Sequence, residues 1–127
     1  MNRKFFSLLA MNLVFSANTA FAAKDSCDAK SSKKAFAKCA ACHSIKEGGA
    51  TLLGPNLHGI INRYSGALEG FPYSPAMMAY QKKWTEKELD KFLQDPMKVV
   101  PGTMMAFGGL RKERDRQAVL CYLRNNS

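Results

Sequence analysis

The 127-residue chain lacks the features of several common protein classes. No apolar run reaches the ~20 residues that a membrane-spanning helix needs, and acidic residues are few, with 10 Asp and Glu against 19 Lys and Arg. Long low-complexity tracts, internal repeats and alternating strand patterns are also missing. With 46% hydrophobic residues, the chain is too apolar for a disordered acidic protein. The composition therefore predicts a basic, soluble, globular protein of one domain.

The first 22 residues have the layout of a secretory signal peptide. Cationic residues 3–4 precede an apolar stretch at 5–15, and residues 20–22 (Ala-Phe-Ala) fit the small-x-small pattern that signal peptidase recognises. An uncleaved membrane anchor is the alternative, but the apolar stretch is too short for one. We therefore predict cleavage after Ala22.

Cleavage would divide the chain into a signal peptide (1–22) and one domain (23–127). The loss of Arg3 and Lys4 would lower the formal net charge from +9 to +7. The domain is expected in the periplasm, without stable membrane insertion, and nucleic acid is a poor partner for an exported protein despite the positive charge. A domain this short usually needs an added staple to be stable.

The motif at residues 39–43 (Cys-Ala-Ala-Cys-His) is the strongest chemical signal in the sequence, because it is the pattern for c-type haem attachment. Two thiols on the last turn of a helix can reach the two vinyl groups on one porphyrin edge and form thioethers. His43 then lies beneath the ring with an imidazole nitrogen aimed at the iron. The motif predicts one covalent haem c, attached at Cys39 and Cys42 and ligated by His43.

Three other uses of these residues stay open. A thiol-disulfide redox pair is one, although such a pair normally opens a helix after a strand, and here it closes a helical stretch. A zinc site would need a second pair of Cys or His ligands, and none follows. A plain structural disulfide between the two cysteines is the third.

Residues 101–107 (Pro-Gly-Thr-Met-Met-Ala-Phe) offer a thioether sulfur. In electron-transfer cytochromes such a weak, soft donor completes an iron that His binds on the other side, and it raises the reduction potential. Pro and Gly form a turned loop that can hold one sulfur over the ring. Five of the seven methionines lie outside this loop, and most of them are expected to pack in the core.

With these motifs in this order, the chain resembles the class I c-type cytochromes, of the mitochondrial and small bacterial periplasmic kind. The resemblance implies an all-α cytochrome c fold, with about four to five short helices and long loops around one haem. It also implies a carrier that moves one electron between Fe(II) and Fe(III) and is not an enzyme. The matching segments are residues 39–43, residues 54–59 (Gly-Pro-Asn-Leu-His-Gly), Phe71 with Tyr73, Trp84, and residues 101–107.

The resemblance assigns roles to single residues. In the family, the second methionine of such a loop binds iron, which selects Met105 over Met104. The carbonyl of Pro55 is expected to accept a hydrogen bond from the outer nitrogen of His43, while His58 is expected to be an exposed loop residue and not a ligand. The positions that hold the haem propionates are Arg63, Tyr73, Ser74, Trp84 and Thr103, and the pocket wall includes Leu57, Leu93 and Phe107.

The chain also departs from the mitochondrial pattern. Phe92 and Met77 replace a tyrosine and an asparagine, which removes polar groups beside the iron. Met97 and Met104 replace lysines of the cationic docking ring, so this face is less positive. In the first helix, Ser32 stands where a packing glycine is usual, and Phe36 lies three residues before Cys39 instead of four.

Capping residues predict where the first two helices begin. Ser31 or Ser32 is expected to cap a helix that runs to about Cys42. Ser74 followed by Pro75 is an N-cap and first-turn pair, which predicts a second helix through about position 82.

Two more helices are expected towards the C-terminus. Residues 85–88 (Thr-Glu-Lys-Glu) form a capping box for a third helix, which Pro96 stops. A last helix is expected over about 111–125, with apolar residues that cover the first helix. The Gly-rich stretch between 47 and 70 is predicted to form long loops, which would be suspect in a small domain without a large cofactor.

Cys27 and Cys121 flank the first and last helices, which cross in this family. Because export would expose both thiols to oxidation, we hypothesise a disulfide between them. Two free thiols are the alternative, since the sequence does not give the Cα separation.

The expected partners are acidic redox proteins, such as a membrane oxidase, a reductase or a photosynthetic reaction centre, and the carrier is expected to be a monomer. By resemblance, the lysines that would steer such partners are Lys33, Lys38, Lys98 and Lys112. A haem enzyme or gas sensor with an open sixth position is the alternative function, and it requires that Met105 be absent from the iron or easily displaced.

Overall fold

The computed structural model describes residues 27–127, so the predicted signal peptide lies outside the described residues. Five helices follow one another in this part of the chain, and none of its residues forms an extended strand. They are α1 (Ala29–Ala40), α2 (Pro75–Tyr80), α3 (Glu86–Gln94), α4 (Pro96–Val99) and α5 (Glu113–Arg124). The predicted all-α fold with four to five short helices and long loops is confirmed.

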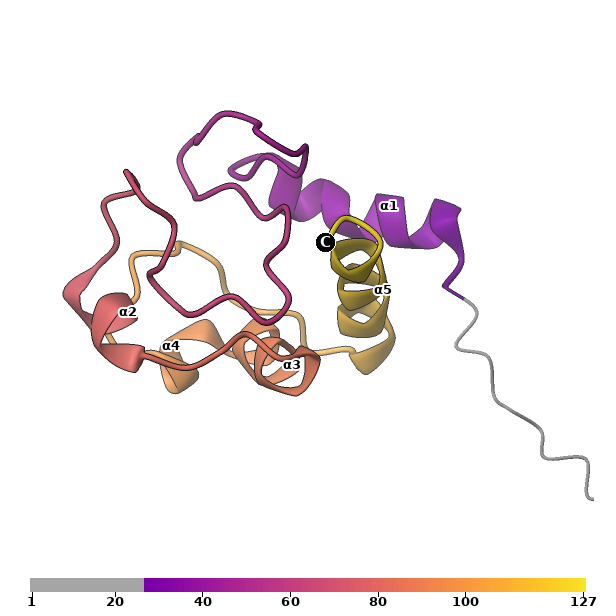
Figure 1. Ribbon diagram of the computed structural model, residues 1–127. Helices are drawn as coiled ribbons and strands as arrows, with labels where there is room; N and C mark the ends of the chain where they lie inside the picture. Colours follow the sequence, from indigo (N-terminus) through magenta and orange to yellow (C-terminus); the bar gives the residue numbers. More distant parts are fainter. Residues whose placement is uncertain (1–26) are drawn as a thin grey trace, which may run out of the picture.

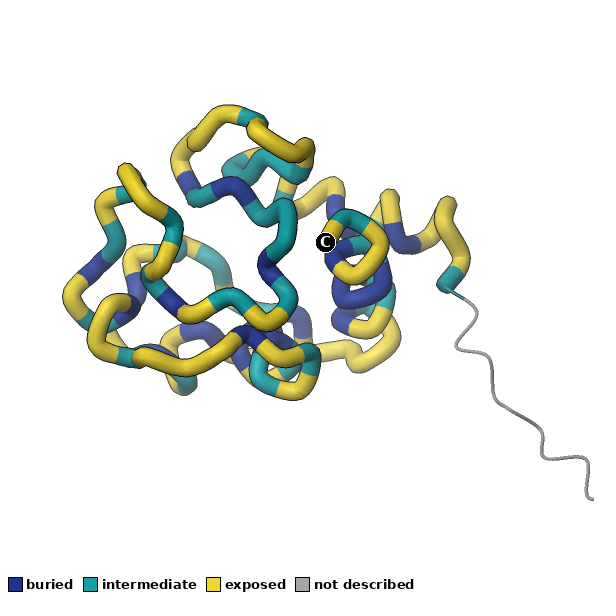
Figure 2. Tube along the Cα trace, viewed as in Figure 1, coloured by how far each residue is buried: buried dark blue, intermediate teal, exposed yellow. Residues whose placement is uncertain are grey.

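The helices gather into two groups. In Figure 1, α1 and α5 lie together at one end of the molecule, and α2, α3 and α4 lie along the lower side. The long segment between α1 and α2 forms the wide loops at the top and left of the view. A few residues of these loops are buried, as are residues of the helices (Figure 2), so the loops contribute to the core.

The helix pair α1 and α5 forms the main packing contact. The ring of Phe36 on α1 stacks on Tyr122 of α5, with centroids 4.6 Å apart. Val119, Leu120 and Leu123 of α5 are buried, and burying one such side chain contributes about 1.5–3 kcal/mol. The prediction that the last helix covers the first is confirmed.

The N-terminus of α1 differs from the prediction. The cap is Asp28, whose carboxylate accepts a hydrogen bond from the backbone N–H of Ser31 at 2.8 Å. Ser32 is instead buried inside the first turn, and its hydroxyl donates to the carbonyl of Ala29 at 3.1 Å. The predicted serine cap is wrong because the helix begins one turn earlier, where an aspartate fills the same role. α1 also ends at Ala40, before the predicted Cys42.

The starts of α2 and α3 follow the prediction. The Ser74 hydroxyl accepts from the N–H of Met77 at 3.1 Å, with Pro75 as the first helical residue. Thr85 caps α3 by accepting from the N–H of Glu88 at 3.2 Å. The second half of the capping box is not formed, because the N–H of Thr85 donates to the carbonyl of Lys83.

The region around Pro96 contains a helix that the sequence analysis missed. α3 stops at Gln94, as predicted, but Pro96 is also the first residue of the short helix α4. Asp95 caps α4 by accepting from the N–H of Lys98 at 3.1 Å. A proline therefore ends one helix and begins the next, since its fixed φ suits a first turn.

An ion pair between a buried arginine and a half-buried aspartate joins α3 to α5. Arg116 is 7% exposed, and its Nε donates to the Asp90 carboxylate at 2.8 Å. Its Nη1 donates to the carbonyls of Leu110 and Arg111, both at 3.0 Å. These bonds satisfy a cation that would otherwise be costly to bury.

A disulfide bond joins Cys27, just before α1, to Cys121 of α5, with Cα atoms 5.7 Å apart. That separation lies within the ordinary range for disulfides. The bond closes a loop with a sequence separation of 94 residues and links the two ends of the described chain.

Candidate functional site

The motif residues lie where α1 ends and the chain turns into the first long loop. Cys39 is in the last turn of α1, and its carbonyl accepts from the N–H groups of Cys42 at 3.0 Å and His43 at 2.9 Å. Both thiols are free and half-buried. This turn brings the two thiols and the imidazole to the end of one helix, as the attachment motif requires.

The orientation of His43 is set by the segment that follows. Its Nδ1 lies 2.7 Å from the carbonyl oxygen of Pro55. A carbonyl only accepts, so Nδ1 carries the proton and Nε2 keeps a free lone pair, as a metal-binding imidazole needs. Burial lowers the pKa of His43, although the bond to Pro55 opposes this, and a lower pKa favours the neutral, ligating form. The expected Pro55 hydrogen bond is confirmed.

Gly54 packs directly against the His43 ring. A Cβ at this position would stand 2.3 Å from Cε1 of His43, so any larger residue would collide with the imidazole. The N–H of Gly54 donates to the carbonyl of Cys42 at 2.8 Å, which holds the two segments together. The role of Gly54 beyond its place in a matching segment was not predicted, because nothing in the local sequence shows which ring packs against it.

The raised pKa of the Cys39 thiol is evidence against a thiol-disulfide redox site. Burial raises its pKa to about 11, with Lys38 acting weakly in the opposite direction. Reactive redox cysteines have a lowered pKa, since the thiolate is the nucleophile. A zinc site is also disfavoured: within residues 27–127, no group of three or more His, Cys, Asp or Glu side chains is placed to hold a metal ion.

The loop after α4 distinguishes the two adjacent methionines. The N–H of Thr103 donates to the carbonyl of Val100 at 2.9 Å, and Gly102 has a φ of +92°, which together give a tight turn with proline and glycine at its centre. Met105 is half-buried and packs on the core, whereas Met104 is 70% exposed. The backbone N–H of Met105 donates to Thr103 Oγ1 at 3.3 Å. This geometry favours Met105 as the inward thioether.

Three of the predicted propionate-holding residues converge. The backbone N–H of Trp84 donates to the carbonyl of Arg63 at 2.8 Å, and Arg63 and Tyr73 are close enough to affect each other's pKa. Burial is the main cause of the pKa shift of each residue: it lowers the pKa of Arg63 and raises that of Tyr73. The electrostatic interaction between the two residues acts in the opposite direction in each case. The cationic guanidinium and the neutral phenol are therefore both available as donors.

Three of the predicted donors also have structural roles, and of these only the N-cap role of Ser74 was predicted. Arg63 donates to the carbonyls of Asn56 at 2.7 Å and His58 at 3.2 Å, which uses two of its five N–H groups. The hydroxyl oxygens of Ser74 and Thr103 accept from backbone N–H groups, but their protons remain free to donate.

Asn56 is another structural residue that the prediction missed. It is 7% exposed, and its amide group donates to the carbonyls of Lys46 at 2.8 Å and Gly49 at 2.9 Å. Its Oδ1 accepts from the N–H of His58 at 2.7 Å. His58 is half-buried, so the prediction that it is exposed is wrong. This network holds the loop that carries Gly54 and Pro55, so it indirectly positions His43.

The predicted wall residues lie in or against the apolar core. Leu93 is buried, and Leu57 and Phe107 are half-buried beside the same cluster. Phe92 and Met77, which replace polar residues of the mitochondrial pattern, are buried as well. Phe92 lies against Trp84, with ring centroids 4.9 Å apart.

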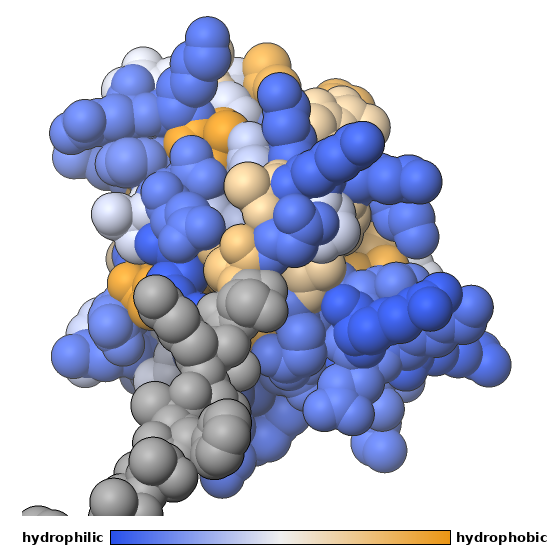
Figure 3. Space-filling view, turned by 90° about the vertical axis from the view of Figure 1, so that its right-hand side faces the viewer, coloured by the Kyte–Doolittle hydropathy of each residue, from blue (hydrophilic) through white to orange (hydrophobic). Residues whose placement is uncertain are grey.

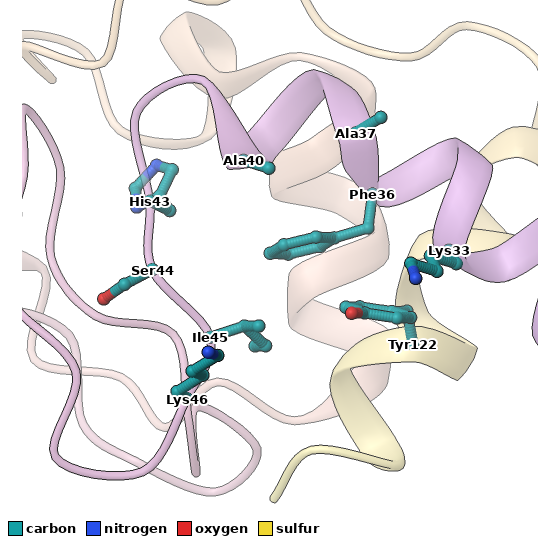
Figure 4. Close-up of a pocket in the computed structure, with 9 residues that line it drawn as sticks. All are labelled: Lys33, Phe36, Ala37, Ala40, His43, Ser44, Ile45, Lys46 and Tyr122. Carbon is teal, nitrogen blue, oxygen red and sulfur yellow. The ribbon is translucent and has the colours of Figure 1, made fainter.

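An open pocket of about 370 Å³ lies between α1, α5 and residues 43–46. Figure 4 shows His43 at one end of it, with Phe36 and Tyr122 as the aromatic wall and Ile45 beneath them. Lys33 and Lys46 are at the rim.

The surface has both charged and apolar exposed side chains. Figure 3 shows a largely hydrophilic face with smaller apolar areas between the charged groups. Lys33, Lys38, Lys98 and Lys112 are all exposed, as predicted. Apolar side chains are exposed as well, at Leu52, Leu53, Met97 and Met104. No helix within residues 27–127 is long and apolar enough to span a membrane.

Comparison with known proteins agrees with this geometry. The family model described as Cytochrome c matches residues 29–127. A cytochrome c of Stellaria longipes is 42% identical over 101 residues, covering 79% of this chain and 94% of the relative. A cytochrome c of Kluyveromyces lactis is 42% identical over 86 residues, covering 68% and 78%. A cytochrome c-550 of Nitrobacter winogradskyi is 43% identical over 96 residues, covering 76% and 88%.

Proposed function

The chain belongs to the cytochrome c family, and on that premise we propose that it is a periplasmic carrier of single electrons with its haem attached at Cys39 and Cys42. As a member of the family it carries one covalent haem c with its iron, and it transfers electrons and is not an enzyme. The haem, when bound, supplies the one-electron couple between Fe(III) and Fe(II).

The proposed axial ligands are His43 and Met105. The bond from His43 Nδ1 to the Pro55 carbonyl leaves Nε2 as the coordinating nitrogen and makes it a stronger donor. The half-buried thioether of Met105 is the softer ligand and favours the reduced state. With both positions taken by protein groups, the iron would not bind substrate.

The proposed propionate donors are Arg63, Tyr73, Ser74, Trp84 and Thr103. Two carboxylates pushed against a low-dielectric pocket need donors or a cation. Arg63 supplies the cation and Tyr73 a phenolic proton, and both are half-buried. Phe92, Met77, Leu57, Leu93 and Phe107 would keep water away from the iron.

The observation that carries this assignment is the 2.7 Å contact between His43 Nδ1 and the Pro55 carbonyl, with Gly54 against the ring. It fixes both the tautomer and the direction of the imidazole. A buried histidine with an unrelated structural role would not need a free, oriented Nε2.

The mass of the intact, exported protein tests the proposal. We expect a polypeptide that begins at Ala23 and carries the added mass of one haem, which denaturing solvent does not remove. A Cys39→Ala, Cys42→Ala variant should lose the covalent haem. A product with the mass of its amino acids alone would contradict the proposal.

Periplasmic location and signal cleavage after Ala22 are part of the proposal. They are supported by the layout of residues 1–22 and by the similarity to a bacterial cytochrome c-550. Cell fractionation with N-terminal sequencing should find the haem protein in the periplasm, starting at Ala23. A full-length chain in the cytoplasm would refute this part.

The proposed partners are acidic redox proteins, such as a membrane oxidase, a reductase or a reaction centre. Exposed Lys33, Lys38, Lys98 and Lys112 support electrostatic steering, while exposed Met97 and Met104 weaken the positive face. The rate of electron transfer to an acidic redox protein should therefore fall with added salt. A rate independent of salt would reject steering.

We also propose that the protein is a monomer and that the Cys27–Cys121 disulfide forms after export. A disulfide is not expected in the cytochrome c family, so this bond would be a particular feature of the present chain. The Cα separation of 5.7 Å and the oxidising compartment support it.

A further inference from the structure

The pocket between α1, α5 and the start of the first long loop lies beside the proposed haem site. Of the residues proposed to attach, ligate or surround the haem, His43 alone lines it. The α1 side of the pocket is hollow because Ala37 and Ala40 are small and exposed. They share one face of α1 with Lys33 and Phe36, since residues three, four and seven positions apart line up on a helix.

Hydrogen bonds hold the loop wall of the pocket in place. The carbonyl of Ser44 accepts from the N–H of Leu57 at 2.9 Å, and the carbonyl of Lys46 accepts from the amide group of Asn56 at 2.8 Å. Ile45, between these two anchored residues, is half-buried and packs on the core. The wall is therefore fixed before any ligand arrives, which lowers the cost of binding.

The wall opposite Ile45 is aromatic. The ring of Phe36 is buried and stacks on that of Tyr122, with centroids 4.6 Å apart and planes at 27°. The disulfide between Cys27 and Cys121 joins the start of α1 to α5, so the two helices that carry these rings are fixed to each other. The pocket therefore presents aromatic rings on one side and an aliphatic side chain on the other (Figure 4).

The polar groups of the pocket are donors or cations. None of the lining residues is acidic. Lys33 and Lys46 at the rim form no ion pair with any of residues 27–127. The hydroxyl of Tyr122 makes no hydrogen bond within the same residues. An apolar interior with an uncompensated positive rim suits a ligand that has an apolar body and an anionic end.

We propose that this pocket binds a small aromatic carboxylate. Its ring would lie against Phe36, Tyr122 and Ile45, and its carboxylate would meet the ammonium groups at the rim. The site goes beyond the proposed electron transfer, since it uses none of the groups that hold the haem except the side of His43. It would give the protein a second ligand, bound without covalent chemistry.

Size and shape favour this class of ligand. The volume of about 370 Å³ is near the lower end of the ~300–1,000 Å³ range of small-molecule sites, so a body of one or two fused rings fits. A planar ring can stack on the aromatic wall or meet it edge to face, whereas a flexible alkyl chain lacks this contact. A neutral ligand would leave both rim cations without a partner.

Nuclear magnetic resonance titration of the reduced holoprotein with 2-naphthoate tests the proposal. We expect saturable shifts of the amide signals of residues 33–46 and of Tyr122, with a Kd of about 1 mM or tighter for a ligand of this size. 2-Naphthylmethanol, which has the same rings without the charge, should bind more weakly. Decanoate, which has the charge without the rings, should also bind more weakly.

Variants locate the two parts of the site. The double variant Lys33→Ala, Lys46→Ala should weaken 2-naphthoate binding by about threefold or more, since exposed charge pairs contribute modestly. Lys30→Ala, Lys34→Ala is the matched control, because it removes the same charge from exposed residues of α1 that do not line the pocket. This control should bind 2-naphthoate as the unmodified protein does.

Ala37→Leu should abolish binding by filling the hollow on α1. Because Ala37 is exposed, the change should leave the fold and the haem spectrum intact. Ala67→Leu, at another exposed alanine that does not line the pocket, is its control and should keep binding.

Four results would overturn the proposal: shifts that do not saturate, shifts centred away from the pocket, unchanged binding in Ala37→Leu, or equal losses in the two lysine double variants. Binding of the alcohol or of decanoate as tight as that of 2-naphthoate would overturn the assigned ligand class. The mass and optical spectrum of each protein, taken before the titration, report separately on the haem. A failure of the proposed function would therefore be distinguished from a failure of this site.

Discussion

The carbonyl oxygen of Pro55 lies 2.7 Å from Nδ1 of His43, and the residue before it, Gly54, has no side chain because the same imidazole occupies that space. One dipeptide thus both orients the ring and makes room for it. The arrangement is rigid, since the N–H of Gly54 is bound to the carbonyl of Cys42.

Gly54→Ala should disturb the axial histidine. Its Cβ would stand 2.3 Å from Cε1 of His43, and relieving such an overlap typically costs about 1–3 kcal/mol. We expect lower stability and an altered low-spin haem spectrum, measured by denaturant unfolding and absorbance. Gly108→Ala is the matched control, because a Cβ there meets nothing within 4 Å. Equal behaviour of the two variants would contradict the packing argument.

Met105→Leu and Met104→Leu should have opposite outcomes, although the two residues are adjacent. Met104 is 70% exposed, and Met105 packs on the core. Loss of the thioether ligand in Met105→Leu should lower the reduction potential by roughly a few tenths of a volt, given the ~0.8 V range that axial ligands span. Met104→Leu should leave the potential almost unchanged. Voltammetry of the two variants measures both potentials. A large fall in the reduction potential of Met104→Leu, with little change in Met105→Leu, would instead assign the ligand to Met104.

Arg116→Met should destabilise the contact between α3 and α5. The change removes three hydrogen bonds and leaves Asp90 without its buried cation, so we expect a loss of about 3 kcal/mol in the free energy of unfolding. Arg114→Met is the control, because Arg114 is 80% exposed in its pair with Asp115 and such pairs contribute about 0–1 kcal/mol. Similar losses in the two variants, measured by urea unfolding, would count against the buried pair.

The ion pair between Glu86 and Arg124 should make stability depend on pH in the acid range. The two hydrogen bonds, at 2.7 and 2.6 Å, lower the pKa of Glu86 from its ordinary 4.5. A lowered folded-state pKa gives stability that is present above pH 4.5 and is lost as the pH falls through the folded value. Solvent screening keeps the effect small, because both side chains are partly exposed.

Glu86→Gln should therefore flatten the pH dependence of the free energy of unfolding below about pH 4.5. Glu113→Gln, a change of another acidic residue in a first helical turn, controls for loss of charge alone. If Glu86→Gln leaves the slope of the free energy of unfolding against pH unchanged, the pair does not contribute to stability.

The Cys27–Cys121 bond should stabilise the oxidised protein. Replacing both cysteines by alanine, or reducing the bond, should lower the free energy of unfolding by about 2–4 kcal/mol, since the bond closes a long loop in the unfolded chain. The alanine variant should not respond to reductant. Two free sulfhydryls in the unfolded, unreduced holoprotein would show that the bond does not form.

Local signals in the sequence were enough to predict the chemistry and several helix starts. Ser74, which precedes Pro75, and Thr85 each cap a helix by accepting a hydrogen bond from a backbone N–H three residues later. Their roles can therefore be predicted from the spacing of the sequence alone. The pair of thiols and the imidazole at residues 39–43 are likewise neighbours in the chain. Asp28 was missed as a cap because serines three and four residues later are equally good capping residues.

Several contacts between distant segments could not be predicted. Arg116 and Asp90 are 26 residues apart, and nothing in either segment marks them as partners. The bonds from Asn56 and Arg63 to loop carbonyls depend on how a long segment without periodicity folds back on itself. The contact between the rings of Tyr80 and Trp84 likewise depends on how the turn between α2 and α3 folds.

The absorbance of the oxidised, exported protein at the red edge of the visible spectrum at neutral pH tests the central claim most directly. Iron held by His43 and Met105 should show the weak sulfur-to-iron charge-transfer band, and Met105→Leu should abolish it. A coloured protein that lacks this band at neutral pH, or a band that persists in Met105→Leu, would contradict the proposed pair of ligands.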